Sequence, residues 1–303
     1  GSNNVALGYR ALTTEDAHGF NVAVGHEALA TLNAGANGYN TAVGYQTGTA
    51  MTTGVSNTIM GGLAGDSLTT GAQNIALGRS ALSAAIGAGD NVAIGYAAMS
   101  ANTTGNANVA IGTQALNGAN NSGTSTYNIG IGHNAGLVTS TGTKNILIGG
   151  FAGDAITTAN YNIAIGHNAL STEDTGSRNV AIGFEALRDL NYDGNSYNAA
   201  IGWQAGVLMT TGIKNTIIGG LAGDALTTGE QNVAMGYLAL STEDTGSKSV
   251  AIGVSALKTQ DYDGDAYNVA VGHDAGKLIT TGTLNTLIGG LAGDAMTTSI
   301  ANV

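Results

Sequence analysis

One five-residue string returns along the whole chain: asparagine, an aliphatic residue, usually alanine, a second aliphatic residue and glycine. Most returns are 17 residues apart, a few are 19 apart and one is 20 apart. A period of this length is typical of one turn, or rung, of a solenoid. The chain is therefore predicted to be a repeat protein whose 303 residues add rungs, not a globular enzyme.

The asparagine that opens each rung, called position 1, is predicted to stack on its counterparts in the neighbouring rungs. Its amide would donate and accept along the axis, and each bond would contribute about 1 kcal/mol. Ser249 replaces asparagine in one rung and is a tolerated substitution, because its hydroxyl can still hydrogen bond. The predicted ladder consists of Asn4, Asn21, Asn40, Asn57, Asn74, Asn91, Asn108, Asn128, Asn145, Asn162, Asn179, Asn198, Asn215, Asn232, Asn268 and Asn285.

Positions 2 to 4 alternate large, small and large side chains, as in Val180, Ala181 and Ile182. This alternation predicts a short strand with one face filled by aliphatic side chains and the other closely approached by a neighbour. The glycine at position 5 predicts a bend, after which we expect a second short strand and a polar return loop that holds the extra residues of the longer rungs. The chain has no proline to interrupt a backbone ladder. The predicted fold is all-β, a parallel β-roll of 17 complete rungs of about 17 residues.

A larger repeat of about four rungs is superimposed on the rungs. In the rungs that open at Asn57, Asn145, Asn215 and Asn285, position 3 becomes large and position 6 becomes glycine, as at Ile217 and Gly220. This exchange of bulk predicts a packing layer with compensated volume. The expected organisation is one continuous array, 1–303, with larger units at approximately 4–73, 74–161, 162–231 and 232–301.

Composition excludes several classes of partner. The net charge of −11 disfavours nucleic acid and anionic membrane surfaces, which need basic patches. No apolar run is long enough to insert into a membrane. The chain contains no cysteine, which removes disulfides and thiolate metal sites. It opens without methionine and stops early in a new rung, so we expect a segment of a longer array.

Histidine recurs at position 6, a place that tyrosine, phenylalanine or tryptophan fills in other rungs. Consecutive rungs never both carry histidine there, so a packing or surface row is the simpler interpretation than a metal site. No nucleophile, base and orienting group occur together at a non-repeating place, and the glycine-rich strings lack the lysine of a phosphate loop. The sequence therefore predicts no enzyme and no cofactor. The position 6 histidines are His26, His133, His167 and His273.

Two return loops carry alternating oxygen ligands of the kind that Ca²⁺ prefers. They are Asp261, Asp263 and Asp265, and, one unit earlier, Asn191, Asp193 and Asn195. The glycine is misplaced for a calcium loop and no bidentate glutamate follows, so a solvated acidic turn is the simpler account and Ca²⁺ the alternative. The aspartates that follow the glycine-rich layer are expected to cap turns. These are Asp66, Asp154, Asp224 and Asp294.

The strings Val109-Ala110-Ile111-Gly112 and Val180-Ala181-Ile182-Gly183 resemble the head repeats of trimeric autotransporter adhesins of the YadA type. Stretches such as 171–176 and 219–224 also resemble structural proteins and fibres of tailed phages. The resemblance implies a left-handed parallel β-roll with two strands per turn, an obligate trimer of side-by-side rolls, and a role in attachment. The rungs are longer than the usual head repeats, which leaves a three-sided solenoid open. We expect the alanine face to lie at the contact between chains.

The interpretation that follows is a non-enzymatic, extracellular fibre segment on a virion or cell surface. It would be the shaft or host-contacting part of a phage tail fibre or similar appendage, with itself, as a homotrimer, and a host-surface receptor or glycan as partners. A bacterial cell-surface trimeric autotransporter adhesin is the alternative. A monomeric ice-binding or carbohydrate-binding β-solenoid is a second alternative.

Overall fold

The computed structural model describes residues 1–16, 18–119 and 125–303, and among them every regular element is a strand of three residues. Each strand starts directly after the first residue of a rung, where β-branched and other aliphatic side chains favour extended backbone. The strands are β1 (Val5–Leu7), β2 (Val22–Val24), β3 (Thr41–Val43), β4 (Thr58–Met60), β5 (Ile75–Leu77), β6 (Val92–Ile94), β7 (Val109–Ile111), β8 (Ile129–Ile131), β9 (Ile146–Ile148), β10 (Ile163–Ile165), β11 (Val180–Ile182), β12 (Ala199–Ile201), β13 (Thr216–Ile218), β14 (Val233–Met235), β15 (Val250–Ile252), β16 (Val269–Val271) and β17 (Thr286–Ile288).

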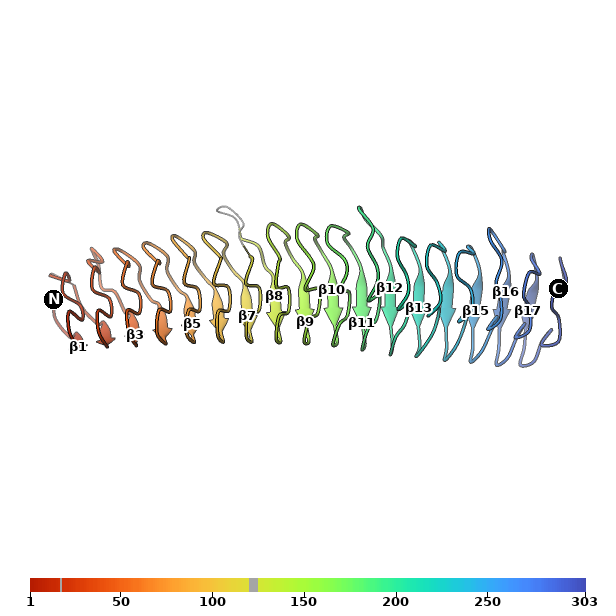
Figure 1. Cartoon of the computed structure of the whole chain (residues 1–303), viewed down its shortest axis with the longest axis horizontal. Helices are drawn as coiled ribbons and strands as arrows, with labels where there is room; N and C mark the ends of the chain where they lie inside the picture. The colour runs from red at the N-terminus through yellow and green to blue at the C-terminus, as the bar shows by residue number, and fades with distance from the viewer. Residues whose placement is uncertain (17, 120–124) are drawn as a thin grey trace. The chain divides into compact units, whose positions relative to one another are not determined.

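The described chain forms two compact units, one of residues 1–151 with 156–158 and one of residues 152–155 with 159–303. Within each unit, consecutive strands pair in parallel and position by position, as Val5 pairs with Val22 and Ile163 with Val180. Each rung adds one arrow and a loop that returns to the start of the next (Figure 1). The predicted all-β class and the parallel solenoid with rungs of about 17 residues are confirmed.

The two faces of each strand are the reverse of the expected arrangement. Ala181, at position 3 of β11, is completely buried inside the rung, whereas Val180 and Ile182 lie on the outer face and are only half-buried. Ala186 and Leu187, on the opposite side of the same rung, are also completely buried. Their side chains share the interior with Ala181, so the space between the two sides of the rung is narrow. A small side chain is therefore needed inside. The prediction that the alanine face meets another chain is wrong.

The opposite side of the rung is not a strand, contrary to expectation. Glu185 and Leu187, at positions 7 and 9, take φ of 54° and 49°, in the left-handed region, and this alternation prevents extended backbone. Their amides still link rungs: the N–H of Glu185 donates to the carbonyl of His167 (3.0 Å) and that of Leu187 to the carbonyl of Ala205 (3.1 Å). The rungs are thus hydrogen-bonded on both sides, with one strand per rung.

The bend at position 5 needs glycine for two reasons. Gly183 has a φ of 139°, and a Cβ there would lie 2.2 Å from the carbonyl oxygen of Gly202 in the next rung. No side chain fits at that distance, so the rank of glycines allows the rungs to stack at the spacing of paired strands.

The volume compensation of the larger repeat lies inside the rung, at a place other than the predicted one. Ile217, the large residue at position 3, is completely buried. A Cβ at Gly206 or Gly223, both at position 9, would lie 3.1 or 3.4 Å from its Cδ1, so leucine is replaced by glycine there to make room. Gly220, at position 6, has no atom within 3.6 Å of such a Cβ and lies on the outside. Position 9, not position 6, compensates for position 3.

Candidate functional site

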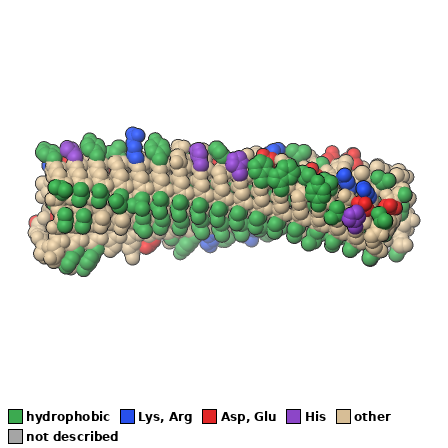
Figure 2. Space-filling model, turned by 90° about the horizontal axis from the view of Figure 1, so that it is seen from below, with side chains coloured by type: hydrophobic (Ala, Val, Ile, Leu, Met, Phe, Trp, Pro, Cys, Tyr) green, Lys and Arg blue, Asp and Glu red, His purple; other side chains and the backbone are tan. Residues whose placement is uncertain are grey.

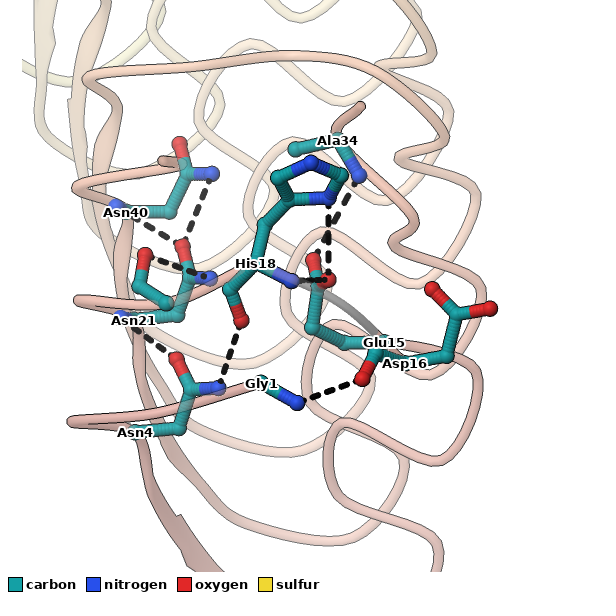
Figure 3. Close-up of polar contacts among 9 residues, drawn as sticks. Gly1, Asn4, Glu15, Asp16, His18, Asn21, Ala34 and Asn40 are labelled. Atoms are coloured by element: carbon teal, nitrogen blue, oxygen red, sulfur yellow. Dashed lines mark hydrogen bonds and ion pairs between the residues drawn. The ribbon is translucent and has the colours of Figure 1, made fainter. Parts of the chain in front are cut away.

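The asparagines of position 1 form the ladder that closes each rung and joins it to the next (Figure 3). The side-chain oxygen of Asn21 accepts the backbone N–H of Asn40 (3.1 Å) and its side-chain amide (3.2 Å). The amide of Asn40 also donates to the carbonyl of Gly54, in the return loop of the same rung, at 2.9 Å. Both asparagines are buried. The ladder is structural, because its polar groups are used within the chain.

Gln260 supplies hydrogen bonds to the ladder in the rung where Ser249 replaces asparagine. Its Nε2 donates to the hydroxyl of Ser249 (2.8 Å) and to Glu243 (2.9 Å), while its Oε1 accepts from the amide of Asn268 (2.9 Å). Gln260 is completely buried at position 12, where most rungs place an apolar or small residue. The sequence identified Ser249 as the exception in the ladder. It gave no indication that Gln260 takes over the contacts of the missing asparagine, because Gln260 lies in a different part of the rung.

Buried glutamates at position 12 were missed by sequence reasoning. Glu173 accepts hydrogen bonds from the backbone N–H groups of Gly176 (2.5 Å) and Tyr192 (3.2 Å), and so holds the return loops of two rungs. Burial raises the pKa of Glu173, and these hydrogen bonds oppose the shift only in part. Burial raises the pKa of Glu243 in the same way. The shared string Ser-Thr-Glu-Asp-Thr-Gly was the available signal.

The residues predicted as possible calcium ligands make hydrogen bonds or an ion pair with different residues of the chain. Asp263 accepts from the hydroxyl of Thr245 (2.7 Å), and Asp265 forms an ion pair with Lys248 (2.6 Å). In the earlier unit, Asp193 accepts from Thr175 (2.7 Å) and Asn195 from Arg178 (3.1 Å). The backbone N–H of Asn191 donates to the carbonyl of Thr210 (2.8 Å).

Asp261 instead lies near two carboxylates of the preceding rung. It forms with Glu243 and Asp244 a group whose oxygens lie within 4.8 Å of one another. Glu243 is already hydrogen-bonded by Gly246 (2.7 Å), Gln260 and Tyr262, so its part in the structure is explained without an ion.

The aspartates after the glycine-rich layer are half-buried, and three of the four have one side-chain oxygen that is buried without a hydrogen-bond partner. The Oδ1 atoms of Asp66, Asp154 and Asp224 are buried without a hydrogen-bond partner. Burial raises the pKa of each of these carboxyl groups, while hydrogen bonds from local backbone N–H groups oppose the shift. Backbone contacts of this kind fit a role in the turn.

Position 6 carries a row of exposed rings that stack from rung to rung. In the first unit, His26 stacks between Tyr9 (5.1 Å between centroids) and Tyr45 (5.3 Å). In the second unit, Phe184 stacks between His167 (5.7 Å) and Trp203 (6.3 Å). His26, His133 and His167 therefore belong to a surface row with aromatic neighbours, as the sequence predicted, whereas His273 lies 3.4 Å from Asp274.

A second exposed row precedes the ladder at the last position of the rungs. Arg178 lies between the rings of Tyr161 and Tyr197, with its guanidinium carbon 5.5 and 5.6 Å from their centroids. The ammonium group of Lys248 lies 5.3 Å from the ring of Tyr267. Cations on tyrosine rings stabilise this surface by about 0.5–1 kcal/mol each.

The outer face of the strands lies between these two rows and is apolar. In the second unit it consists of the side chains at positions 2 and 4, which are apolar except at Thr216 and Thr286, and Ile201 is 39% exposed. Figure 2 shows such hydrophobic side chains in rows along one face of the molecule. No polar side chain interrupts this outer strand face in β10, β11, β14, β15 or β16.

The described residues enclose no pocket. Among residues 1–16, 18–119 and 125–303, no helix has the length and hydrophobicity needed to cross a bilayer. The chain matches no known protein family, no curated protein and no solved structure.

Proposed function

We propose that this chain is a segment of a non-enzymatic extracellular fibre whose copies associate side by side as a homotrimer. The fibre would be the shaft or host-contacting part of a phage tail fibre or a similar appendage. The observation that carries the proposal is the outer strand face, where the large aliphatic residues of positions 2 and 4 point away from the interior of their own rung.

Exposed apolar surface of this regularity favours burial against another surface. The eight strands of the second unit, with a spacing of ~4.8 Å, cover a strip of about 400 Å². A strip of this size falls in the range of the largest apolar patch on a single protein, and such patches are often functional. A second copy of the chain is the partner that fits best, because its strand face has the same apolar character and the same rung spacing.

The resemblance to YadA-type head repeats supports the same arrangement, since such heads work as trimers of parallel β-rolls. The role in attachment comes from this resemblance and from the resemblance to phage fibres, with a host-surface receptor or glycan as the partner. A bacterial cell-surface autotransporter adhesin would use the same face, so the association tested below is common to both interpretations.

Light scattering coupled to size exclusion tests the association. The chain mass is 29.9 kDa, and we expect the unmodified segment to elute with three times this mass. Ile201→Asp should reduce the mass to that of one chain while circular dichroism stays unchanged, because the side chain points outward. Thr228→Asp, on the exposed return loop, is the matched control and should keep the threefold mass. A single-chain mass for the unmodified segment, or a threefold mass for Ile201→Asp, would contradict the proposal.

A further inference from the structure

Arg178 is exposed on the second unit with most of its hydrogen-bond donors unused. Its guanidinium carbon lies 5.5 Å from the ring centroid of Tyr161 and 5.6 Å from that of Tyr197, and its Nε donates to Oδ1 of Asn195 (3.1 Å). An arginine side chain carries five N–H donors, and this contact uses one of them. Among the described residues, the Nη1 and Nη2 atoms of Arg178 have neither a hydrogen-bond acceptor nor an ion-pair partner. Its terminal donors are therefore available to a ligand.

The surrounding structure holds the Arg178 side chain at both ends. Arg178 is the last residue of its rung, with a φ of 68°, and its backbone N–H donates to the carbonyl of Asn160 (3.1 Å). The next residue, Asn179, is buried in the ladder. At the other end, two rings and the bond to Asn195 hold the guanidinium. A group that is fixed in this way loses less entropy when it binds a ligand.

Lys214 is a second exposed cation of the same row, one rung beyond Tyr197. Its backbone N–H donates to the carbonyl of Ser196 (2.7 Å), so its place in the row is also fixed. In the part of the chain that the structure describes, Lys214 forms no ion pair. Tyr197 is 50% exposed and lies in the rung between the two cations. We call Arg178, Tyr197 and Lys214 the cationic site.

The corresponding loop of the next larger unit carries a cation that is already neutralised. There, three residues take the places of Arg178, Asn195 and Tyr197, namely Lys248, Asp265 and Tyr267. The Nζ of Lys248 forms an ion pair with Asp265 at 2.6 Å and lies 3.2 Å from the hydroxyl of Tyr267. The place of Lys214 is taken by Leu284. The amide of Asn195, unlike the carboxylate of Asp265, leaves the charge of its cation available.

We propose that the cationic site binds an acidic group, a carboxylate or a sulfate, of a host-surface glycan. The planar guanidinium of Arg178 pairs with two oxygens of such a group, and Lys214 adds a second positive charge. The hydroxyl of Tyr197 can donate to or accept from a sugar hydroxyl. The described residues enclose no pocket, which suits a polymer lying along the surface, because small-molecule sites are concave. The inference rests on the proposed attachment function, for which it names the ligand class and the contacting residues.

Charge selects among the possible anionic polymers. Nucleic acids bind through many phosphate contacts with Lys or Arg, whereas this site has two cations and the chain a net charge of −11. The carboxylates of distant rungs are screened over about 8 Å at physiological salt, so one acidic group close to the two cations is still attracted. Asp193, in the same return loop as Asn195, opposes this attraction, so we expect one site to bind weakly. A glycan with acidic groups spaced among neutral sugars fits these conditions.

Three substitutions test the cationic site. Arg178→Gln removes the guanidinium, and Asn195→Asp gives Arg178 the carboxylate partner that Asp265 provides to Lys248. Lys248→Gln is the matched control, because it removes a positive charge that is already paired. None of the three residues is buried, so circular dichroism should stay unchanged.

Calorimetric titration of the full segment measures binding. The probes are hexasaccharides of hyaluronan and of heparin, with cellohexaose as the neutral probe and a short DNA duplex as the alternative polyanion. We expect at least one acidic hexasaccharide to bind, and its affinity to fall as salt is added. Arg178→Gln and Asn195→Asp should each weaken this binding about tenfold, and Lys248→Gln should leave it unchanged.

The inference is overturned if no acidic hexasaccharide binds, if cellohexaose or the duplex binds as tightly, or if Asn195→Asp binds like Lys248→Gln. The mass of each sample, measured by light scattering, separates this inference from the proposed fibre. Absence of glycan binding with a threefold mass removes only the cationic site, whereas a single-chain mass with glycan binding intact removes only the association.

Discussion

Gln260→Leu tests whether one buried side chain replaces the missing asparagine of the ladder. Gln260 is completely buried and makes three hydrogen bonds, to Ser249, Glu243 and Asn268. Leucine has a similar volume and occurs naturally at the same position 12, for example at Leu226. The substitution therefore removes the polar contacts with little change in packing.

The expected loss of stability follows from these contacts. The bonds to Ser249 and Asn268 contribute about 1 kcal/mol each, and the bond to the Glu243 carboxylate about 1.5–3 kcal/mol. Burial of the leucine side chain offsets about 1–2 kcal/mol. Asn268 keeps its bond to Gly282 (2.7 Å), and Glu243 keeps its backbone donors, so no further penalty is added. We expect a net destabilisation of roughly 3–4 kcal/mol.

Urea unfolding at fixed protein concentration measures the loss, and hydrogen exchange of residues 249–268 locates it, because solenoids can unfold in parts. Ser249→Asn is the rescue: in the Gln260→Leu background it restores the ladder residue and should recover more than half of the loss. The reasoning is refuted if Gln260→Leu unfolds like the unmodified chain, or if Ser249→Asn adds no stability to it.

Three further outcomes are expected. Ile217→Ala should cost about 2–5 kcal/mol in urea unfolding, and Gly206→Leu, whose Cβ would lie 3.1 Å from Cδ1 of Ile217, should be tolerated only in that background; equal tolerance in both would show that position 9 does not make room for Ile217. The pKa of Glu173 is raised above its usual 4.5, so its stabilising contribution is present below the unfolded-state pKa and is lost as pH rises through the folded-state pKa. Glu173→Leu should therefore show a smaller fall in Tm between about pH 4 and 7, and an identical fall would exclude this assignment. Asp263→Ala removes one contact of an exposed loop and should change the free energy of unfolding by less than about 0.5 kcal/mol, whereas a larger loss would indicate an undetected role such as cation binding.

The larger repeat was predicted only in part from the residue pattern. The sequence identified the layer that contains Ile217 and the need for compensating volume. It assigned the compensation to Gly220, because both positions change together in the same four rungs. The structure assigns it to Gly206 and Gly223, since position 9 faces the interior through a left-handed backbone that no propensity predicts for the leucines found there in other rungs. Gly220 is left on the outer surface of the rung.

The candidate sites divide in a similar way. The ladder of asparagines was predictable, because one polar residue at a fixed period in an apolar string has few roles other than stacking. The ring row was also predictable, since tyrosine, phenylalanine, tryptophan and histidine alternate at a single position. The buried Glu173 and Gln260 were not, because a charged or polar side chain in a loop string is usually solvated. Only the closure of the rung brings backbone N–H groups and Ser249 within their reach.

The sequence by itself determined the period, the three-residue strands, their parallel register and the asparagine ladder, because these follow from spacing and from hydrogen bonding between neighbours. The tertiary structure decided which strand face is the inside. Alternation of Val180, Ala181 and Ile182 defines two faces but does not say which one closes on the rest of the rung. The left-handed residues at positions 7 and 9 bring the opposite side so close that only alanine fits between in most rungs. The larger aliphatic side chains are left on the outer face for that reason.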